Sequence, residues 1–348
     1  MKRILCFSDK LNVKCELTAR INFIFFSHIF NNLITHKSVY FHYCEKISYL
    51  CNLIKQLFDM MTDIPNLDEL IRMALLEDVG DGDHSTLACI PNTAVNTAVM
   101  VAKQDGIVCG MEVGERVFRY VNDCFYHSQI PIDILCLKQD GDAVHKGEKL
   151  MTIDGSSAVI LTAERTALNF MQRLSGIATQ THNMVEMIAD LHAQLLDTRK
   201  TTPNMRLLEK YAVKCGGGTN HRIGLYDMIM LKDNHIDFAG GIPAAIDRTL
   251  AYLKEKGKQL KIEIEVRNLD ELDQVLQHGG IDRIMLDNFD VETLREAIKR
   301  IEGRYETEAS GGITDATLRS YAETGVDFIS CGALTHHIKS MDISLIKK

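Results

Sequence analysis

The spacing of apolar residues after residue 60 first indicates a mixed α/β region. In LDELIRMALLEDVG, residues 67–80, apolar positions recur at helical spacing until a glycine ends the pattern. Short strand-like runs follow, joined by Gly and Asp turns: TAVMVAKQDGIVCG, IDILCLKQDGDAV and KLMTIDGS. These runs predict a mixed α/β domain over residues 61–160.

A long helical period then connects this region to the rest of the chain. The run AVILTAERTALNFMQRLSGIATQTHNMVEMIADL has few helix breakers. Ser175-Gly176 is a weak point within it, because Gly is a poor helix former. The pattern predicts two connecting helices over residues 161–190, bent near that dipeptide.

Beyond residue 190 the chain alternates between strand-like and helical runs. Amphipathic segments such as NLDELDQVLQHGG and VETLREAIKRIEG separate six strand-like runs. The expected strands lie at about residues 193–197, 226–231, 260–265, 282–287, 305–310 and 327–331. Alternating strands and helices predict a parallel α/β barrel, or part of one, over residues 191–340, followed by a C-terminal tail over residues 341–348.

The first sixty residues differ from all of this in composition. They contain no Gly and no Pro, yet carry seven of the 13 Phe and four of the 10 Cys. The stretch INFIFFSHIFNNLITH is interrupted by polar residues and is shorter than the about 20 apolar residues of a membrane span. No small-residue cleavage site follows it, so it matches a targeting peptide poorly. We expect residues 1–60 to be a non-functional extension, with the working protein starting at Met60 or Met61.

Charge and cysteine content narrow the class of protein. The chain has 39 basic and 47 acidic residues, a net charge of -8. Subtracting the 8 basic and 4 acidic residues of the first sixty leaves 31 basic and 43 acidic residues for residues 61–348. Such an acidic protein is not expected to bind nucleic acid. The ten Cys show no CxxC and no metal-ligand spacing, which favours reduced thiols in the cytoplasm.

Polar chemistry gathers at the ends of the six expected strands. In barrels of this kind, catalytic groups collect at the carboxyl ends of the strands. The first expected strand ends at Asp197, Arg199 and Lys200, and the next three end at Lys232, Glu265 and Asp287 in that order. The last two lead into the loops ASGG and SCGA. With the loop CGGGTNHRIG, which brings His221 and Arg222, they predict one rim that attracts a highly charged anion.

Two features of this rim suggest particular ligands. The loops ASGGIT and SCGALT each place small residues between a strand and a helix-like run, which leaves backbone N–H groups for a phosphate. Glu265 and Asp287 offer hard oxygen ligands that suit Mg²⁺ beside a polyphosphate. Either carboxylate could instead pair with a lysine or arginine, and Arg199-Lys200 could be a solvated turn.

Several of these segments resemble one family. The quinolinate phosphoribosyltransferases, also called carboxylating nicotinate-nucleotide pyrophosphorylases, have segments similar to TAERTALNFMQRLSGIATQT, DTRKTTP, GGGTNHRIGLYDMIMLKDNH, EIEV, MLDNF and EASGGI. The resemblance covers about residues 64–340. Asn204 stands where family members usually have Gly, and Asn also tolerates a left-handed conformation.

The resemblance implies a fold, a reaction and an assembly. The fold is an N-terminal mixed α/β sandwich domain followed by an incomplete parallel α/β barrel. The reaction transfers the phosphoribosyl group of phosphoribosyl pyrophosphate to quinolinate with decarboxylation, which gives nicotinate mononucleotide, pyrophosphate and CO₂ for NAD biosynthesis. The assembly is a homodimer, possibly a higher oligomer, with active sites at the subunit interface and no membrane contact.

The resemblance also implies roles for individual residues. Quinolinate would be held by Arg165, Arg199, His221, Arg222 and Lys232, with Arg165 supplied by the partner subunit. Phosphoribosyl pyrophosphate would be held by Lys200, Thr201, Glu265 and Asp287, the two carboxylates through Mg²⁺, and its 5-phosphate by Ser310, Gly311, Gly312 and Gly332. The residues expected to be catalytic are Arg165, Lys200, Lys232, Glu265 and Asp287.

Three other functions remain open on the sequence. A related transferase could act on nicotinate or another small acid. A barrel lyase could form a Schiff base on Lys232, which would need an apolar pocket and a lowered lysine pKa. The chain could also bind anions without catalysis.

Overall fold

The structure, a computed structural model, describes residues 64–348. The expectation for residues 1–60 lies outside the described residues. Within residues 64–348, no helix is both long and apolar enough to cross a membrane.

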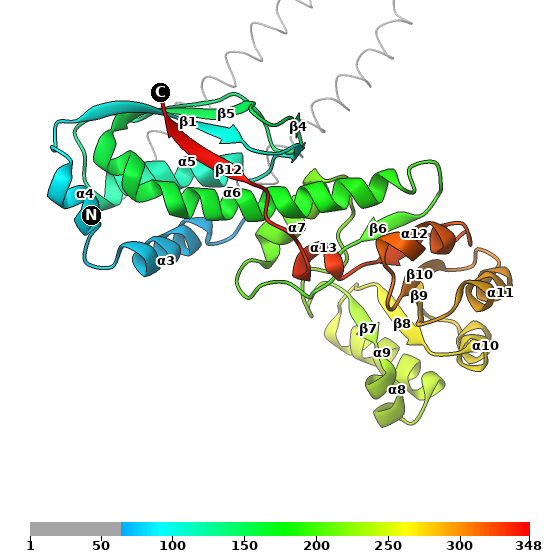
Figure 1. Cartoon of the computed structure of the whole chain (residues 1–348). Coiled ribbons are helices and arrows are strands. Elements are labelled where there is room, and N and C mark those ends of the chain that lie inside the picture. The colour runs from blue at the N-terminus through cyan, green and yellow to red at the C-terminus, as the bar shows by residue number, and fades with distance from the viewer. Residues whose placement is uncertain (1–63) are drawn as a thin grey trace, which may run out of the picture. The chain divides into compact units, whose positions relative to one another are not determined.

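An antiparallel sheet forms the first layer of the fold, and Figure 1 shows helices lying along one side of it. Its strand order is β12-β1-β5-β3. The strands are β1 (Val95–Ala102), β3 (Asp133–Cys136), β5 (Lys149–Ser156) and β12 (Ile343–Lys347), and a second, two-stranded sheet pairs β2 (Gly106–Ile107) with β4 (Ala143–Val144). The helices are α3 (Leu67–Val79), α4 (His84–Cys89), α5 (Met111–Tyr120) and the π-helix η1 (Val121–Phe125).

The end of the chain corrects one expectation. Residues 341–348, expected as a C-terminal tail, include β12, which pairs antiparallel with β1 from Ala98↔Lys347 to Ala102↔Ile343. The last strand therefore returns from the barrel to the first sheet, so both ends of the described chain build that domain. An apolar alternating face that pairs with a strand far upstream leaves no local sign of its partner.

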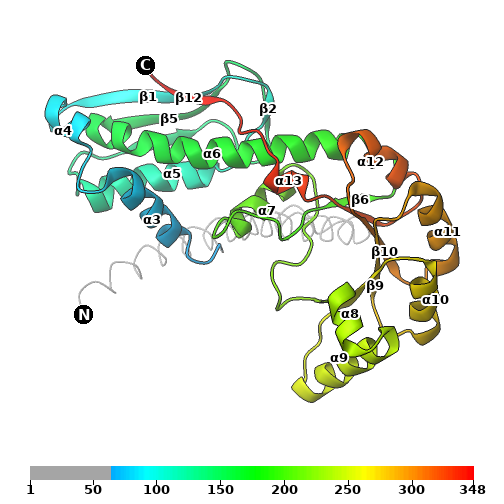
Figure 2. The ribbon, with the colours of Figure 1, turned by 60° about the horizontal axis from the view of Figure 1, so that its bottom comes forward.

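The connecting segment corrects a second expectation. Instead of two helices bent near Ser175-Gly176, residues 157–186 form one helix, α6 (Ser157–Glu186). A Cβ at Gly176 would overlap the carbonyl oxygen of Lys339 and lie 3.0 Å from Cα of Ser340. Gly176 thus allows the returning chain to lie against α6 and does not bend it. In Figures 1 and 2, α6 runs from beside the antiparallel sheet to the barrel.

The second layer is an open barrel of six parallel strands in the order β6-β11-β10-β9-β8-β7. Its strands are β6 (Gln194–Leu196), β7 (Ile229–Leu231), β8 (Ile262–Val266), β9 (Arg283–Asp287), β10 (Glu306–Ser310) and β11 (Phe328–Ser330). Its helices are α7 (Arg206–Cys215), α8 (Asp233–Ala239), α9 (Ile242–Lys256), α10 (Leu269–His278), α11 (Val291–Ile301), α12 (Asp315–Ala322) and α13 (Ala333–His336). The six strands expected from the sequence are confirmed, each within three residues at its ends.

The barrel is incomplete, because no strand of the described residues joins β6 to β7 directly. The segment between them contributes a single parallel bridge, Leu196↔Thr219, beside β6. Figure 2 shows α8, α9, α10 and α11 lying outside the strands. All six strands point the same way, so the groups at their carboxyl ends meet at one rim.

Candidate active site

A cavity of about 290 Å³ opens at this rim. It is lined by Thr198, Arg199, Lys200, His221, Arg222, Met230, Lys232, Met285, Glu308 and Ser330. Five residues expected to bind substrate therefore meet around one space, namely Arg199, Lys200, His221, Arg222 and Lys232. Four of these side chains, those of Arg199, Lys200, Arg222 and Lys232, are Arg or Lys and so cationic at neutral pH, which is the charge that an anionic ligand would require.

A buried ion pair holds the loops that carry these cations. Asp197 and Lys210 are 0% and 1% exposed and pair with each other. Asp197 also accepts hydrogen bonds from the backbone N–H of His221 at 2.8 Å and from Nδ2 of Asn220 at 2.6 Å, while Lys210 donates to the backbone oxygen of His221 at 3.1 Å. Asp197, which the sequence placed among the rim groups, thus acts inside the protein, where it locks residues 220–221 onto β6.

The two arginines of the cavity lie close enough to repel each other. Burial, and then the charge of Arg199, lower the pKa of Arg222, although a guanidinium stays protonated at neutral pH. Nη1 of Arg222 donates to the backbone oxygen of Met228 at 3.2 Å, which fixes one side of its fork. Nε of Arg199 is buried and has no partner within residues 64–348. A bound carboxylate would supply that partner and relieve the repulsion.

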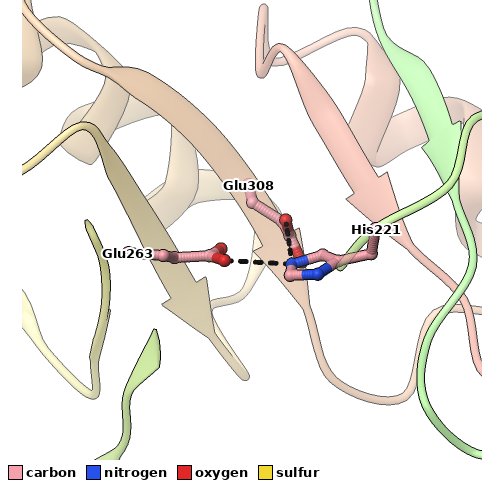
Figure 3. Close-up of side chains that lie close together, drawn as sticks. All are labelled: His221, Glu263 and Glu308. Carbon is pink, nitrogen blue, oxygen red and sulfur yellow. Dashed lines mark ion pairs between the residues drawn. The ribbon is translucent and has the colours of Figure 1, made fainter. Parts of the chain in front are cut away.

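His221 lines the cavity and lies close to two buried carboxylates (Figure 3). Its Nε2 atom lies 3.0 Å from Oε2 of Glu263 and 3.2 Å from Oε2 of Glu308, at ion-pair distance from both. Burial lowers the pKa of His221, but the two neighbouring carboxylates outweigh this effect and raise the pKa to about 9. Burial and Glu308 raise the pKa of Glu263 to about 7.

The ring of His221 also accepts a hydrogen bond, which bears on its protonation. The backbone N–H of Arg222 donates to Nδ1 at 2.7 Å. A cationic ring carries hydrogen on both nitrogens, so this contact conflicts with the raised pKa. We favour the neutral ring with its hydrogen on Nε2, because the Arg222 N–H is fixed by the chain whereas a proton can move to Glu263.

Lys232, Glu265 and Asp287 form the acidic side of the rim. Nζ of Lys232 donates to Oε2 of Glu265 at 2.7 Å. Burial, and then the charge of Glu265, raise the pKa of Asp287, so the two carboxylates repel each other. This pair of hard oxygen donors fits a divalent cation, which would relieve the repulsion. The pairing with Lys232 is also the alternative that the sequence left open for Glu265.

The glycine loops provide free backbone donors. Gly311 and Gly312 have φ of 103° and 61°, and a Cβ on Gly311 would overlap Oδ1 of Asn288. Within the described chain, the N–H groups of both glycines donate no hydrogen bond to a protein atom. Beside Gly332, an added Cβ would lie 2.8 Å from Nε2 of His336 and 3.0 Å from Cδ of Lys200. A side chain at Gly311 or Gly332 would therefore collide with its neighbours, and the role of these loops in holding a phosphate stays a prediction.

Other expected residues lie outside the cavity. Arg165 is exposed on α6 and has no hydrogen bond or ion pair with residues 64–348. Thr201 accepts from Nε of Arg206 at 3.1 Å and so supports its own loop. Asn204 has φ of 65°, which confirms that the asparagine adopts the left-handed conformation in place of Gly. The substrate roles of all these residues stay predictions.

The sequence analysis missed two charged residues of the site, Glu263 and Glu308. The prediction rested on the polar residues at the strand ends, whereas Glu263 in KIEIEV and Glu308 in ETEAS lie two residues before those ends. Side chains alternate along a strand, so Glu263 must share a face with Glu265, and Glu308 with Ser310. That alternation was the available signal.

Comparisons with known proteins agree with this geometry. The family model for the quinolinate phosphoribosyl transferase C-terminal domain matches residues 177–346, and the model for the N-terminal domain of the same family matches residues 83–175. Together they cover well over half of the chain.

Three relatives support the same family. The chain is 43% identical over 295 residues to the nicotinate-nucleotide pyrophosphorylase [carboxylating], chloroplastic, of Arabidopsis thaliana, covering 80% of this chain and 82% of that protein. It is 40% identical over 279 residues to the probable nicotinate-nucleotide pyrophosphorylase [carboxylating] of Bacillus subtilis, covering 80% and 92%. The solved nicotinate-nucleotide pyrophosphorylase of Francisella tularensis superposes with a TM-score of 0.76 at 40% identity, covering 82% and 98%.

Proposed function

The chain belongs to the quinolinate phosphoribosyltransferase family, and we propose that it transfers the phosphoribosyl group of phosphoribosyl pyrophosphate to quinolinate. The products are nicotinate mononucleotide, pyrophosphate and CO₂. The observation that carries this function is the cavity lined by Arg199, Lys200, Arg222 and Lys232 at the carboxyl ends of the strands. Its cations suit a dicarboxylate better than the single carboxylate of nicotinate.

The reaction depends on stabilisation of charged groups by nearby cations more than on general acid or base catalysis. Pyrophosphate leaves ribose C1 as positive charge grows on the sugar, and the pyridine nitrogen of quinolinate attacks without a general base. The alkylated ring is a pyridinium, which can stabilise the carbanion left at C2 when CO₂ departs, and a proton from water then takes the place of CO₂ at C2. Preorganised cations around the acceptor and the leaving group therefore account for most of the required stabilisation.

Glu265 and Asp287 are the residues that fit Mg²⁺, because they offer oxygen donors that repel each other. When bound, the ion would neutralise charge on the departing pyrophosphate. Lys232 donates a hydrogen bond to Glu265, and it would stay close to that carboxylate whether or not Glu265 binds the ion. Gly311, Gly312 and Gly332 would hold the 5-phosphate through backbone N–H groups.

Arg165 is assigned to the active site of a second subunit in a homodimer. Its exposed side chain has no partner within its own described chain and does not line its own cavity. Co-refolding Arg165→Ala with Arg222→Ala tests this arrangement. Half of the dimers should be mixed, and each mixed dimer has one site with neither change, so about a quarter of wild-type activity should return.

Two outcomes decide the co-refolding test. Recovery to about a quarter, with each parent refolded alone remaining inactive, supports a shared site. A mixture as inactive as its parents, while refolded wild type recovers, places Arg165 in its own subunit or outside the site.

The reaction itself is tested by measuring pyrophosphate release with phosphoribosyl pyrophosphate and either quinolinate or nicotinate. We expect release with quinolinate only, accompanied by one CO₂ per pyrophosphate. A Schiff base on Lys232 is disfavoured, because that side chain is 46% exposed and paired with Glu265 rather than buried among apolar groups. Borohydride trapping with quinolinate should therefore leave no covalent adduct.

We also propose that the enzyme works in the cytoplasm. This proposal is supported by the thiols, because all six cysteines within residues 64–348 are free. The name of the Arabidopsis relative places that protein in the chloroplast instead. Fractionation of cells, with detection by an antibody raised against residues 64–348, distinguishes cytoplasm from organelle.

A further inference from the structure

Two buried carboxylates beneath an anion-binding cavity need a physical explanation. Glu263 and Glu308 are both 0% exposed, and Glu308 lines the cavity. Removing a charged group from water is costly unless it is paired. Negative charges below the cavity would also oppose a bound dianion. Their presence indicates that they serve some other group at this place.

Structural pairing explains only part of this cluster. Nη1 of Arg283 donates to Oε2 of Glu308 at 3.1 Å, which accounts for Glu308 in part. Glu263 has a single ion-pair partner within the described residues, namely His221. Neither oxygen of Glu263 has an aligned hydrogen bond, and neither does Nε2 of His221. Among the described residues, Glu263 thus pairs with His221 alone.

The histidine in turn fixes the residue that follows it. Its Nδ1 accepts the backbone N–H of Arg222 at 2.7 Å, and its own backbone N–H is held by Asp197 at 2.8 Å. The orientation of the ring therefore determines the direction in which the chain enters Arg222. The guanidinium of Arg222 is the fork expected to meet a carboxylate of quinolinate.

Resting on the proposed function, we propose that Glu263 and Glu308 are positioning residues for the acceptor. They hold Nε2 of His221 from two sides, and through the ring they set the position of Arg222 in the quinolinate site. Glu263 and Glu308 lie on strands of the barrel, which are more rigid than loops. The imidazole ring of His221 is therefore held in place by the sheet and not by a loop.

A metal ion is the competing explanation for the cluster. One ligand atom from each of His221, Glu263 and Glu308 lies within 4.8 Å of the other two. Against it, Arg283 already brings a positive charge to Glu308, so this carboxylate does not depend on an ion for a cationic partner. Metal analysis of the purified enzyme distinguishes these explanations. An ion bound in one-to-one ratio that is lost in His221→Asn would overturn the positioning role.

The decisive test compares two kinds of conservative change at each glutamate. Aspartate keeps the charge but withdraws the oxygens from Nε2, whereas glutamine removes the charge but leaves an oxygen in place. We expect Glu263→Asp and Glu308→Asp to raise KM for quinolinate at least about 10-fold, with KM for phosphoribosyl pyrophosphate within about 2-fold of wild type. Glu263→Gln and Glu308→Gln should stay within about 3-fold for both substrates.

A matched control comes from the same strand. Glu306 lies two residues before Glu308 on β10 and pairs with Arg283 at 3.0 Å, but it does not contact His221. Glu306→Asp and Glu306→Gln should leave both KM values unchanged. A change in either KM for these variants would show that loss of pairing to Arg283, and not loss of contact with His221, moves the site.

Three results would overturn the proposal. Equal increases in both KM values would indicate general damage to the site. Larger effects of glutamine than of aspartate would indicate a role of charge alone. Failure of both aspartate variants to fold would assign the pair to the stability of the barrel. Calorimetric titration with quinolinate alone distinguishes failure of the positioning role from failure of the proposed reaction. If wild type binds quinolinate tightly but is inactive, the proposed reaction is refuted. The affinities of the same variants for quinolinate then test the positioning role.

Discussion

Gly176 offers a test of how the last strand is held against α6. We consider Gly176→Ala, which adds one methyl group in the middle of a continuous helix. The methyl would overlap the carbonyl oxygen of Lys339 and lie 3.0 Å from Cα of Ser340, both backbone atoms that cannot rotate away. Close by, Gln172 accepts the N–H of Met341 through its backbone oxygen at 2.9 Å.

Two opposing effects set the magnitude. Replacing Gly by Ala within a helix stabilises it by about 0.8 to 1 kcal/mol. Overpacking against fixed atoms costs about 1 to 3 kcal/mol. The difference is about 0 to 2 kcal/mol, and because both clashing atoms belong to the backbone we expect Gly176→Ala to lower the free energy of unfolding by about 1 kcal/mol. The added strain should also loosen the chain that leads into β12.

Gly114→Ala is the matched control. It also lies within a helix, α5, but its added methyl meets Sδ of Met171 at 2.5 Å, the movable part of a flexible side chain. Because that thioether can turn aside, the helix gain should prevail and stability should stay equal or rise.

The chain contains no Trp, so urea unfolding is best followed by circular dichroism. The reasoning is refuted if Gly176→Ala is as stable as wild type, because residues 339–340 would then be free to move away from α6.

Three further outcomes are expected. Arg222→Lys should lose about 2 kcal/mol of transition-state binding, measured as kcat/KM for quinolinate, because an ammonium cannot copy a two-bond contact; unchanged kinetics would remove Arg222 from the site. Glu265→Ala and Asp287→Ala should raise the Mg²⁺ concentration needed for half-maximal activity while the melting temperature holds; a lower melting temperature with an unaltered Mg²⁺ titration would indicate structural pairing instead. A chain beginning at Met61 should keep the activity and melting temperature of the full chain, and a fall of several degrees would show that residues 1–60 stabilise the rest.

The barrel was predictable because its strands are short, most of them are largely apolar, and amphipathic helices separate them. β9, for example, was expected at residues 282–287 and lies at Arg283–Asp287. Periodicity is a local property, so each strand carries its own signal. The rim followed from topology alone, since parallel strands bring their carboxyl ends together.

The corrected elements depend on contacts between distant parts of the chain. β12 is recognisable only through its pairing with β1, about 245 residues earlier. Gly176 looks like a helix breaker until the returning backbone beside it is known. For Glu263 the local signal existed, but its importance depends on His221, which lies on a different loop. The secondary-structure propensity of a segment does not indicate which distant residues it will contact.

The charges of the site divide between loops and strands, and this division explains how an acidic protein binds anions. The cations Arg199 and Lys232 follow the edge strands β6 and β7, and Arg222 lies in the loop between α7 and β7, whereas Glu263, Glu265 and Glu308 lie on the inner strands β8 and β10. At physiological ionic strength exposed charges are screened beyond about 8 Å, so the net charge of -8 matters less than the nearest side chains. The inner carboxylates are buried and screened less, which makes their separation from the acceptor important. A displacement of His221 or Arg222 would bring the acceptor closer to them. We therefore expect quinolinate to bind more weakly when that separation is lost.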